Sequence, residues 1–245
     1  MSYTTIEWTD QTWNPVTGCT KTSDGCKNCY AKDIANKKRL EGEEKYKYGF
    51  DIVKCHPETL SLPYKWKMPQ KIFVNSMSDL FHKDVPFDFI KQVFQVMHHN
   101  EHLTFQILTK RPACLLELNP QLKWTDNIWM GVSVENEKVI NRIDLLRQTD
   151  AKVKFLSIEP LLGSLNNLNL IGIDWVIVGG EKAENARPMK EEWVLDIQQQ
   201  CKDQNVKFFF KQWGGKYGDG GDLLNGKRYK EIPEYTPSFF GMQIY

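Results

Sequence analysis

Residues 153–160 read VKFLSIEP, an apolar run that ends in a carboxylate and a proline. The β-branched and aromatic content of this run, with little alternation, predicts a strand buried on both faces. Five other runs have the same character: 71–75 (KIFVN), 103–108 (LTFQIL), 128–134 (IWMGVSV), 174–178 (DWVIV) and 206–211 (VKFFFK). We also expect a first strand near residues 6–9.

Helical patterns separate these runs. We expect Asp84 to cap one helix, with Pro86 in its first turn. Its apolar stripe comprises Ile90, Val93, Phe94 and Met97, and two further stripes comprise Val139, Ile140, Ile143 and Leu146, and Trp193, Val194, Ile197 and Cys201. Alternating strands and helices predict an α/β fold with parallel pairing. We favour a full or partial parallel (β/α) barrel in a single domain over an open doubly wound sheet.

The reason for favouring a barrel is that every predicted strand ends in polar or chargeable residues. Barrel active sites are built from the carboxyl ends of several strands. The candidate catalytic residues at these ends are Asp79, Lys110, Glu159 and Lys211, and the candidate binding residues are Arg111, Ser133, Glu135, Gly179, Gly180 and Glu181. Buried glutamates need cationic partners. The resulting network is either a substrate site or a structural belt. Asp79 and His82 are residue types that can transfer a proton. The alternative is that Asp79 stabilises a turn.

Three cysteines near the start of the chain form the most specific motif. Cys19, Cys26 and Cys29 lie on one loop, and thiolates are strong ligands for metals and iron–sulfur clusters. A closed zinc site needs four protein ligands, whereas a catalytic centre leaves one position open. We therefore predict an iron–sulfur centre. The alternatives are a zinc site completed by Cys55 or His56, and free thiols.

Composition limits the class of protein. The 245 residues carry a net charge of +1, which argues against a protein that coats nucleic acids. We see no signal peptide and no membrane span, so we expect a cytoplasmic protein whose six cysteines are thiols or metal ligands.

Changes in composition along the chain suggest how it is organised. We expect a barrel over 1–215, with the cysteine loop at 13–30, and a C-terminal loop and arm over 216–245. Residues 36–70 are an insertion that mixes lysines with aromatic residues and several acids. Such a segment either contacts a phosphate backbone and bases or is simply solvated.

Several motifs resemble a known family. They are WNPVTGCTKTSDGCKNCYA (13–31), VNSMSDLFHKDVP (74–86), LTKRP (108–112), GVSVEN (131–136), SIEPLLG (157–163), VIVGGE (176–181) with ARPM (186–189), and FFFKQWG (208–214). In this order they resemble the phage Gp37/Gp68 family, also called the DUF5131 or three-Cys-motif family. That family is similar in layout to radical S-adenosylmethionine (SAM) enzymes and is sometimes grouped with proteins like spore photoproduct lyase.

The resemblance implies a specific chemistry. Cys19, Cys26 and Cys29 would hold a [4Fe–4S] cluster that leaves one iron open for SAM. Reductive cleavage of SAM would then give a radical that abstracts hydrogen from the substrate. Gly179, Gly180 and Glu181 resemble the Gly-Gly-Glu element that meets the SAM amino group. The protein would supply position and electrostatics.

Two features depart from the radical SAM pattern. The usual spacing is three residues and then two, whereas six residues separate Cys19 from Cys26 here. The Gly-Gly-Glu element also comes late in the chain. The resemblance implies an enzyme that acts on a nucleic-acid- or nucleotide-related substrate. The partners we expect are an electron donor and a partner enzyme. The alternatives are a non-catalytic zinc- or cluster-stabilised barrel that binds nucleic acid or protein, and a metal-dependent hydrolase or transferase.

Overall fold

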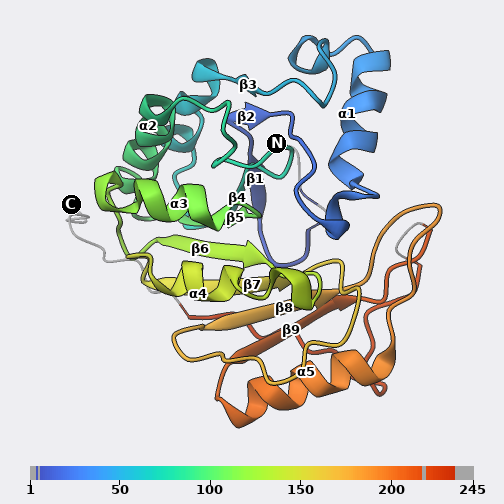
Figure 1. Ribbon diagram of the computed structural model, residues 1–245. Helices are drawn as coiled ribbons and strands as arrows, with labels where there is room; N and C mark the ends of the chain where they lie inside the picture. Colours follow the sequence, from blue (N-terminus) through green and yellow to red (C-terminus); the bar gives the residue numbers. More distant parts are fainter. Residues whose placement is uncertain (1–3, 5, 217–218, 235–245) are drawn as a thin grey trace.

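Seven parallel strands form one sheet in the order β1-β4-β5-β6-β7-β8-β9 (Figure 1). The computed structural model describes residues 4, 6–216 and 219–234. The strands are β1 (Gln11–Trp13), β4 (Lys71–Val74), β5 (Thr104–Thr109), β6 (Ile128–Ser133), β7 (Val153–Ile158), β8 (Trp175–Gly179) and β9 (Lys207–Gln212). This order follows the chain without the reversal that defines a doubly wound sheet. Because β1 and β9 do not pair with each other, the sheet is a partial barrel, as predicted.

The six clear strand predictions are confirmed to within about two residues. The first one is wrong, because β1 begins at Gln11 rather than near residues 6–9. The side chain of Thr9 donates to the carbonyl of Lys71 at 2.9 Å, and the carboxylate of Asp10 accepts from the amide of Lys71 at 2.7 Å. The Asp10 amide also donates to the Lys71 carbonyl at 2.9 Å, and the paired residues of the two strands follow from Gln11 and Ile72.

Helices cover one face of the sheet (Figure 1). They are α2 (Phe87–His98), α3 (Pro112–Leu118), α4 (Arg142–Arg147) and α5 (Glu191–Asp203), while α1 (Tyr30–Leu40) stands on the side toward which the strands point. The three apolar stripes are confirmed in α2, α4 and α5, although Val139 and Ile140 precede α4, in and just after a short 3-10 turn (Glu137–Val139). Asp84 is not the cap of α2. Pro86 takes that position, and the Asp84 carboxylate lies 3.6 Å from His82 Nδ1.

The opposite, inner face of the sheet carries an aromatic layer. Because strand side chains alternate between faces, every second residue points inward. The buried inner cluster contains Trp8, Phe73, Trp129, Phe155, Trp175, Ile177 and Phe209. Its rings pack edge to face, with centroids 4.7 Å apart for Trp8 and Phe73. The layer fills the inner face below the strand ends, and the polar residues of the same alternation follow it toward the carboxyl edge.

One glycine of this inner face has no room for a side chain. A Cβ atom on Gly131 would lie 2.5 Å from the ring of the fully buried Phe155. We expect Gly131→Ala to lower the free energy of unfolding by about 1–3 kcal/mol, as overpacking does. Urea denaturation measures the change. Gly163→Ala, whose Cβ would meet nothing within 4 Å, is the control. Equal midpoints for the two variants would contradict the prediction.

The predicted insertion folds as small elements whose charges are largely satisfied. It contains the 3-10 turns Glu44–Tyr46, Pro57–Ser61 and Pro63–Lys65, and β3 (Lys54–Cys55), which pairs antiparallel with β2 (Val16–Thr17). Lys38 lies 2.7 Å from Glu43, Lys47 pairs with Glu44, and Lys54 stacks on Tyr48. Contact between this insertion and nucleic acid therefore stays a prediction.

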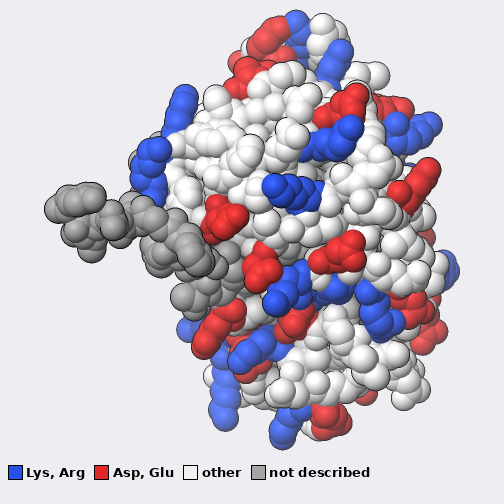
Figure 2. All heavy atoms as spheres, turned by 90° about the vertical axis from the view of Figure 1, so that its left-hand side faces the viewer, with Lys and Arg blue, Asp and Glu red and all other residues white. Residues whose placement is uncertain are grey.

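The remaining features fit the composition. The face shown in Figure 2 mixes acidic and basic side chains and presents no extended area of one sign. No helix among the described residues is both long and apolar enough to cross a membrane. After residue 215, Leu224 is buried in the core and Lys230 bridges Phe209 of β9. The domain division at 215 stays a prediction, and residues 217–218 and 235–245 of the expected loop and arm lie outside the described residues.

Candidate active site at the carboxyl edge of the sheet

The cysteine loop lies across the carboxyl ends of the strands. Gly18 forms an isolated parallel bridge with Ser78, whose hydroxyl donates to the Gly18 carbonyl at 2.6 Å. The loop then passes through a 3-10 turn (Asp24–Cys26), and Cys29 directly precedes α1. All three thiols are half-buried and none forms a disulfide. The structure therefore brings the cysteine loop and the strand-end residues to the same edge, as the barrel prediction requires.

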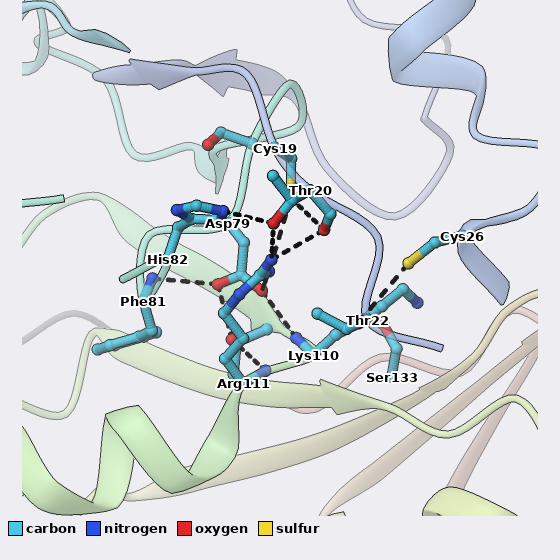
Figure 3. Close-up of polar contacts among 12 residues, drawn as sticks. Cys19, Thr20, Thr22, Cys26, Asp79, Phe81, His82, Lys110, Arg111 and Ser133 are labelled. Atoms are coloured by element: carbon cyan, nitrogen blue, oxygen red, sulfur yellow. Dashed lines mark hydrogen bonds and ion pairs between the residues drawn. The ribbon is translucent and has the colours of Figure 1, made fainter. Parts of the chain in front are cut away.

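The first part of the loop is fixed by Arg111, which follows β5 (Figure 3). Its guanidinium donates to Cys19 Sγ at 3.5 Å and to the Thr20 carbonyl at 2.8 Å. Asp79 holds the same guanidinium at 2.9 Å. The Thr20 hydroxyl also lies 2.7 Å from His82 Nε2. Because His82 Nδ1 accepts the Asp84 amide at 3.2 Å, Nε2 carries the proton that bonds Thr20.

Asp79 is buried and its carboxylate is fully engaged. Besides Arg111, it accepts the Thr109 hydroxyl at 2.7 Å and the amides of Phe81 and Lys110 at 3.0 Å each. Because these bonds fix the Asp79 carboxylate, it can orient the guanidinium of Arg111. Asp79 and His82 are both present at this edge but serve different partners. Their predicted catalytic pairing therefore gains no geometric support, and the role of Asp79 in catalysis stays a prediction.

The middle of the loop is fixed by Glu135, which follows β6. The Ser23 hydroxyl donates to Glu135 Oε1 at 2.8 Å. Lys110 and Arg142 flank the same carboxylate at 2.7 and 3.0 Å, and the Glu135 side chain is completely buried. Arg142 also donates to the Ser133 carbonyl at 2.7 Å, so the predicted binding residue Ser133 takes part through its backbone.

The end of the loop is fixed by Glu181, which follows β8. Asn28 Nδ2 donates to Glu181 Oε2 at 2.9 Å, and Arg187 donates to the same atom through its amide and its Nε, each at 3.0 Å. Arg187 also reaches the Asp24 carbonyl at 3.0 Å. Gly180 is required because a Cβ there would lie 2.0 Å from the Trp213 carbonyl oxygen.

A fourth strand-end pair makes none of these loop contacts. Lys211 of β9 lies 2.8 Å from Glu159, which follows β7, and about a sixth of each side chain is accessible. Ser157 donates to the other Glu159 oxygen at 3.2 Å, and Gly179 leaves room for this carboxylate. The ammonium group of Lys182, which follows Glu181, has no hydrogen bond or ion pair with a described residue. This pair and Lys182 are thus the groups most open to a ligand.

The surroundings of two thiols push their pKa values in opposite directions. Burial raises the pKa of Cys19 to about 11, although Arg111 opposes this. Burial also disfavours the Cys26 thiolate, but hydrogen bonds from the backbone of Thr22 and Ser23 and the charge of Lys110 outweigh it and lower the pKa of Cys26. A lower pKa favours the thiolate, which is the form that binds metals. Cys26 is therefore the better prepared of these two ligands.

Glu135 and Glu181, which bond the cysteine loop, also make the stability of the protein depend on pH. Burial opposes ionisation of Glu135 and Glu181. Lys110 and Arg142 outweigh it at Glu135, as Arg187 and Asn28 do at Glu181, so both pKa values lie below the usual value. The stability these carboxylates contribute is fully present above the unfolded-state pKa of about 4.3 and is lost as pH falls through the folded-state values.

We expect urea titrations between about pH 6 and pH 3 to show a loss of unfolding free energy that is smaller in Glu181→Gln. The substitution removes one of the groups whose protonation costs stability. The same pH dependence in the variant and the parent protein would contradict this account.

The donor set suits a cluster in chemical terms. Where the structure describes the chain, no three His, Cys, Asp or Glu side chains lie close enough to hold one metal ion. In a cubane cluster each thiolate binds a different iron, so the sulfurs surround a space instead of meeting at one ion. Three free, half-buried thiols with Arg111 and Lys110 beside them provide ligands and offset negative charge. Cys55 and His56 were considered above as a fourth zinc ligand. The backbone of Cys55 pairs with Val16 of β2, and His56 Nε2 lies 2.8 Å from the Thr17 hydroxyl.

Several site residues escaped the sequence analysis. Thr20 and Asn28, which adjoin Cys19 and Cys29, bond His82 and Glu181. Arg142 and Arg187 were not recognised as partners of the glutamates. One signal was present for Arg142, since it is a charged residue beside the apolar stripe of α4. Arg187 lies in the ARPM motif, and its bond to Glu181 becomes visible only in the folded structure.

The comparisons with known proteins address the family and the fold. No curated protein matches the chain. Among solved structures, "Spore photoproduct lyase complexed with dinucleoside spore photoproduct" is similar, with a TM-score of 0.45 and 12% identity. The match covers 75% of this chain but only 58% of that one, so the chain spans less than two thirds of its length. The family described as "Protein of unknown function (DUF5131)" matches residues 3–233, and the chain therefore belongs to this family.

Proposed function

We propose that this protein is an iron–sulfur enzyme of the radical SAM type. The observation that carries the proposal is the cysteine loop itself, in which three free thiols lie at the carboxyl edge of a parallel partial barrel. Each thiol lies within three residues of a side chain bonded to a residue at the strand ends. Cys19, Cys26 and Cys29 would hold a [4Fe–4S] cluster. When bound, the cluster and SAM would supply the electron transfer and the radical.

The remaining strand-end residues would divide the work of binding and positioning. Arg111 and Lys110 offset the charge of the thiolates. Because Glu135 and Glu181 already bond the cysteine loop, Glu159 and Lys211 are the strand-end pair best placed to orient a ligand or hold a proton. Gly179 keeps space beside this pair, while Gly180 makes room for the backbone of Trp213. The SAM-binding roles proposed for Arg111, Ser133, Glu135 and the Gly-Gly-Glu element remain part of this proposal.

The deciding experiment is anaerobic reconstitution of the full chain. Iron and sulfide are counted per chain, spectra are compared before and after SAM addition, and 5′-deoxyadenosine is measured after reduction. A cluster that cleaves SAM supports the proposal. A loaded cluster that never cleaves SAM overturns the radical chemistry, and tightly held zinc without iron favours the non-catalytic binding barrel instead.

One cation at this edge suits an anionic substrate such as a nucleotide or nucleic acid. Each of four carboxylates (Asp79, Glu135, Glu159 and Glu181) has a cationic partner among Lys110, Arg111, Arg142, Arg187 and Lys211. The Lys182 ammonium group has no hydrogen bond or ion pair with a described residue. An ammonium group in this position suits a phosphate, which lysine binds as a point charge.

We therefore expect Lys182→Ala to weaken dinucleotide binding about fivefold and to reduce the slope of log K against log salt by about one. Fluorescence anisotropy with a labelled dinucleotide measures both quantities. Lys202→Ala, on the exposed side of α5, is the control and should change neither. Equal affinity of Lys182→Ala and the parent protein would count against a phosphate contact here.

A further inference from the structure

Each cysteine of the loop lies within three residues of a polar side chain that bonds the sheet. Thr20 follows Cys19 and bonds His82, while its carbonyl accepts from Arg111. Ser23, three residues before Cys26, bonds Glu135. Asn28 directly precedes Cys29 and bonds Glu181. Thr20 thus contacts residues that follow β4 and β5, Ser23 contacts a residue that follows β6, and Asn28 contacts a residue that follows β8. The three contacts are therefore spread along the carboxyl edge.

From this arrangement we infer that Thr20, Ser23 and Asn28 are positioning residues that fix the three cysteines before any metal is bound. Glu135 and Glu181 are the fixed points on the sheet that receive two of them. This role differs from the SAM contact that the family resemblance implies for Glu181 and from the binding role expected for Glu135 at its strand end. Three separated points define both the position and the orientation of a loop, whereas one or two would leave it free to rotate.

The sheet side of each contact is rigid because the carboxylates are buried and held by arginines. The Glu135 side chain has no accessible surface and the Glu181 side chain only 2%. Arg142, from α4, holds Glu135, and Arg187, from the segment before α5, holds Glu181 through its backbone amide and its side chain. A buried carboxylate that lost these partners would remain as an uncompensated charge. The glutamates therefore stay in place whether or not the loop is attached.

Close packing supports the same role. A Cβ atom on Gly25 would lie 2.4 Å from Cγ of Glu135, so the loop lies directly against this anchor with no space for a side chain. Asp24, the residue before Gly25, accepts from Asn136 at 3.1 Å and from Lys138 at 3.0 Å. The segment just before Cys26 is thus held by packing as well as by polar contacts.

The experiment uses the metal-free full chain and measures how fast iodoacetamide alkylates Cys26 and Cys29, resolved by mass spectrometry. We expect Cys26 to be alkylated about tenfold faster in Ser23→Ala, and Cys29 about tenfold faster in Asn28→Ala. Each variant loses a hydrogen bond to a charged group that holds the loop. Ser23→Thr, which keeps the hydroxyl, should restore protection. In a Glu181→Gln background, Asn28→Ala should add little, because the anchor is already weakened.

Glu159→Gln is the matched control for these thiol rates. It removes a strand-end carboxylate of the same kind that contacts Lys211 and Ser157 but not the loop. The inference is overturned if the alkylation rates of Cys26 and Cys29 are unchanged in Ser23→Ala and Asn28→Ala. It is also overturned if these rates rise equally in Glu159→Gln. Iron content after reconstitution is a second readout, expected to fall in the loop variants. If the parent protein never takes up iron, the proposed function fails while the alkylation result still decides the positioning role.

Discussion

Cys26→Ala is expected to lose its iron on reconstitution and to form no 5′-deoxyadenosine above the uncatalysed level. Cys26 is the ligand whose thiolate the protein stabilises, through the backbone of Thr22 and Ser23 and through Lys110. A three-thiolate cluster has no spare protein ligand, so the loss of one leaves two attachment points. Since enzymes commonly accelerate reactions by about a millionfold or more, the drop in SAM cleavage should reach at least several orders of magnitude.

The control for this substitution is Cys114→Ala. Cys114 is also a free, half-buried thiol, but it lies in α3 and packs against the core. Iron content and SAM cleavage in this variant should match the parent protein. Retention of the full iron complement by Cys26→Ala would show that the loop is not the ligand set.

Glu135→Ala is expected to lower the free energy of unfolding by about 3–5 kcal/mol, the usual cost of breaking a buried ion pair from one side. The substitution leaves Arg142, whose side chain is only 8% exposed, without its carboxylate. It also frees Lys110 and releases Ser23 of the cysteine loop. Chemical denaturation followed by circular dichroism measures the loss.

A matched control lies two residues further along the chain. Glu137 is exposed, and Glu137→Ala should change stability by no more than about 0.5 kcal/mol. The double substitution Glu135→Leu with Arg142→Met should recover part of the loss, because replacing a buried pair by apolar groups removes the uncompensated charge. A small effect of Glu135→Ala would mean that water solvates Arg142 in the variant.

The sequence was sufficient for the strands and for the polar character of their ends, because both depend on local composition. It was not sufficient for the partners. Lys110 and Arg111 are adjacent, yet successive residues point in different directions. Lys110 therefore bonds Glu135 after β6, on one side of β5, and Arg111 bonds Asp79 after β4, on the other. Such pairings become visible only when the strand order is known.

The cysteine loop shows the same limit. Its three cysteines could be proposed as ligands from their spacing and chemistry. The bond between Asn28 and Glu181, in contrast, joins residues that lie 153 positions apart. Local patterns do not report such a contact. The early strand was misplaced for a related reason, since the bonds from Thr9 and Asp10 to Lys71 depend on the position of β4.

The aromatic layer on the inner face has a consequence for turnover. Trp8, Trp129, Phe155 and their neighbours fill the barrel below the strand ends, so no passage leads out toward the amino side among these packed rings. A small molecule that binds Glu159 and Lys211 therefore arrives and departs at the carboxyl edge, where part of each side chain is accessible. In the proposed enzyme, substrate entry and product release would share this one edge.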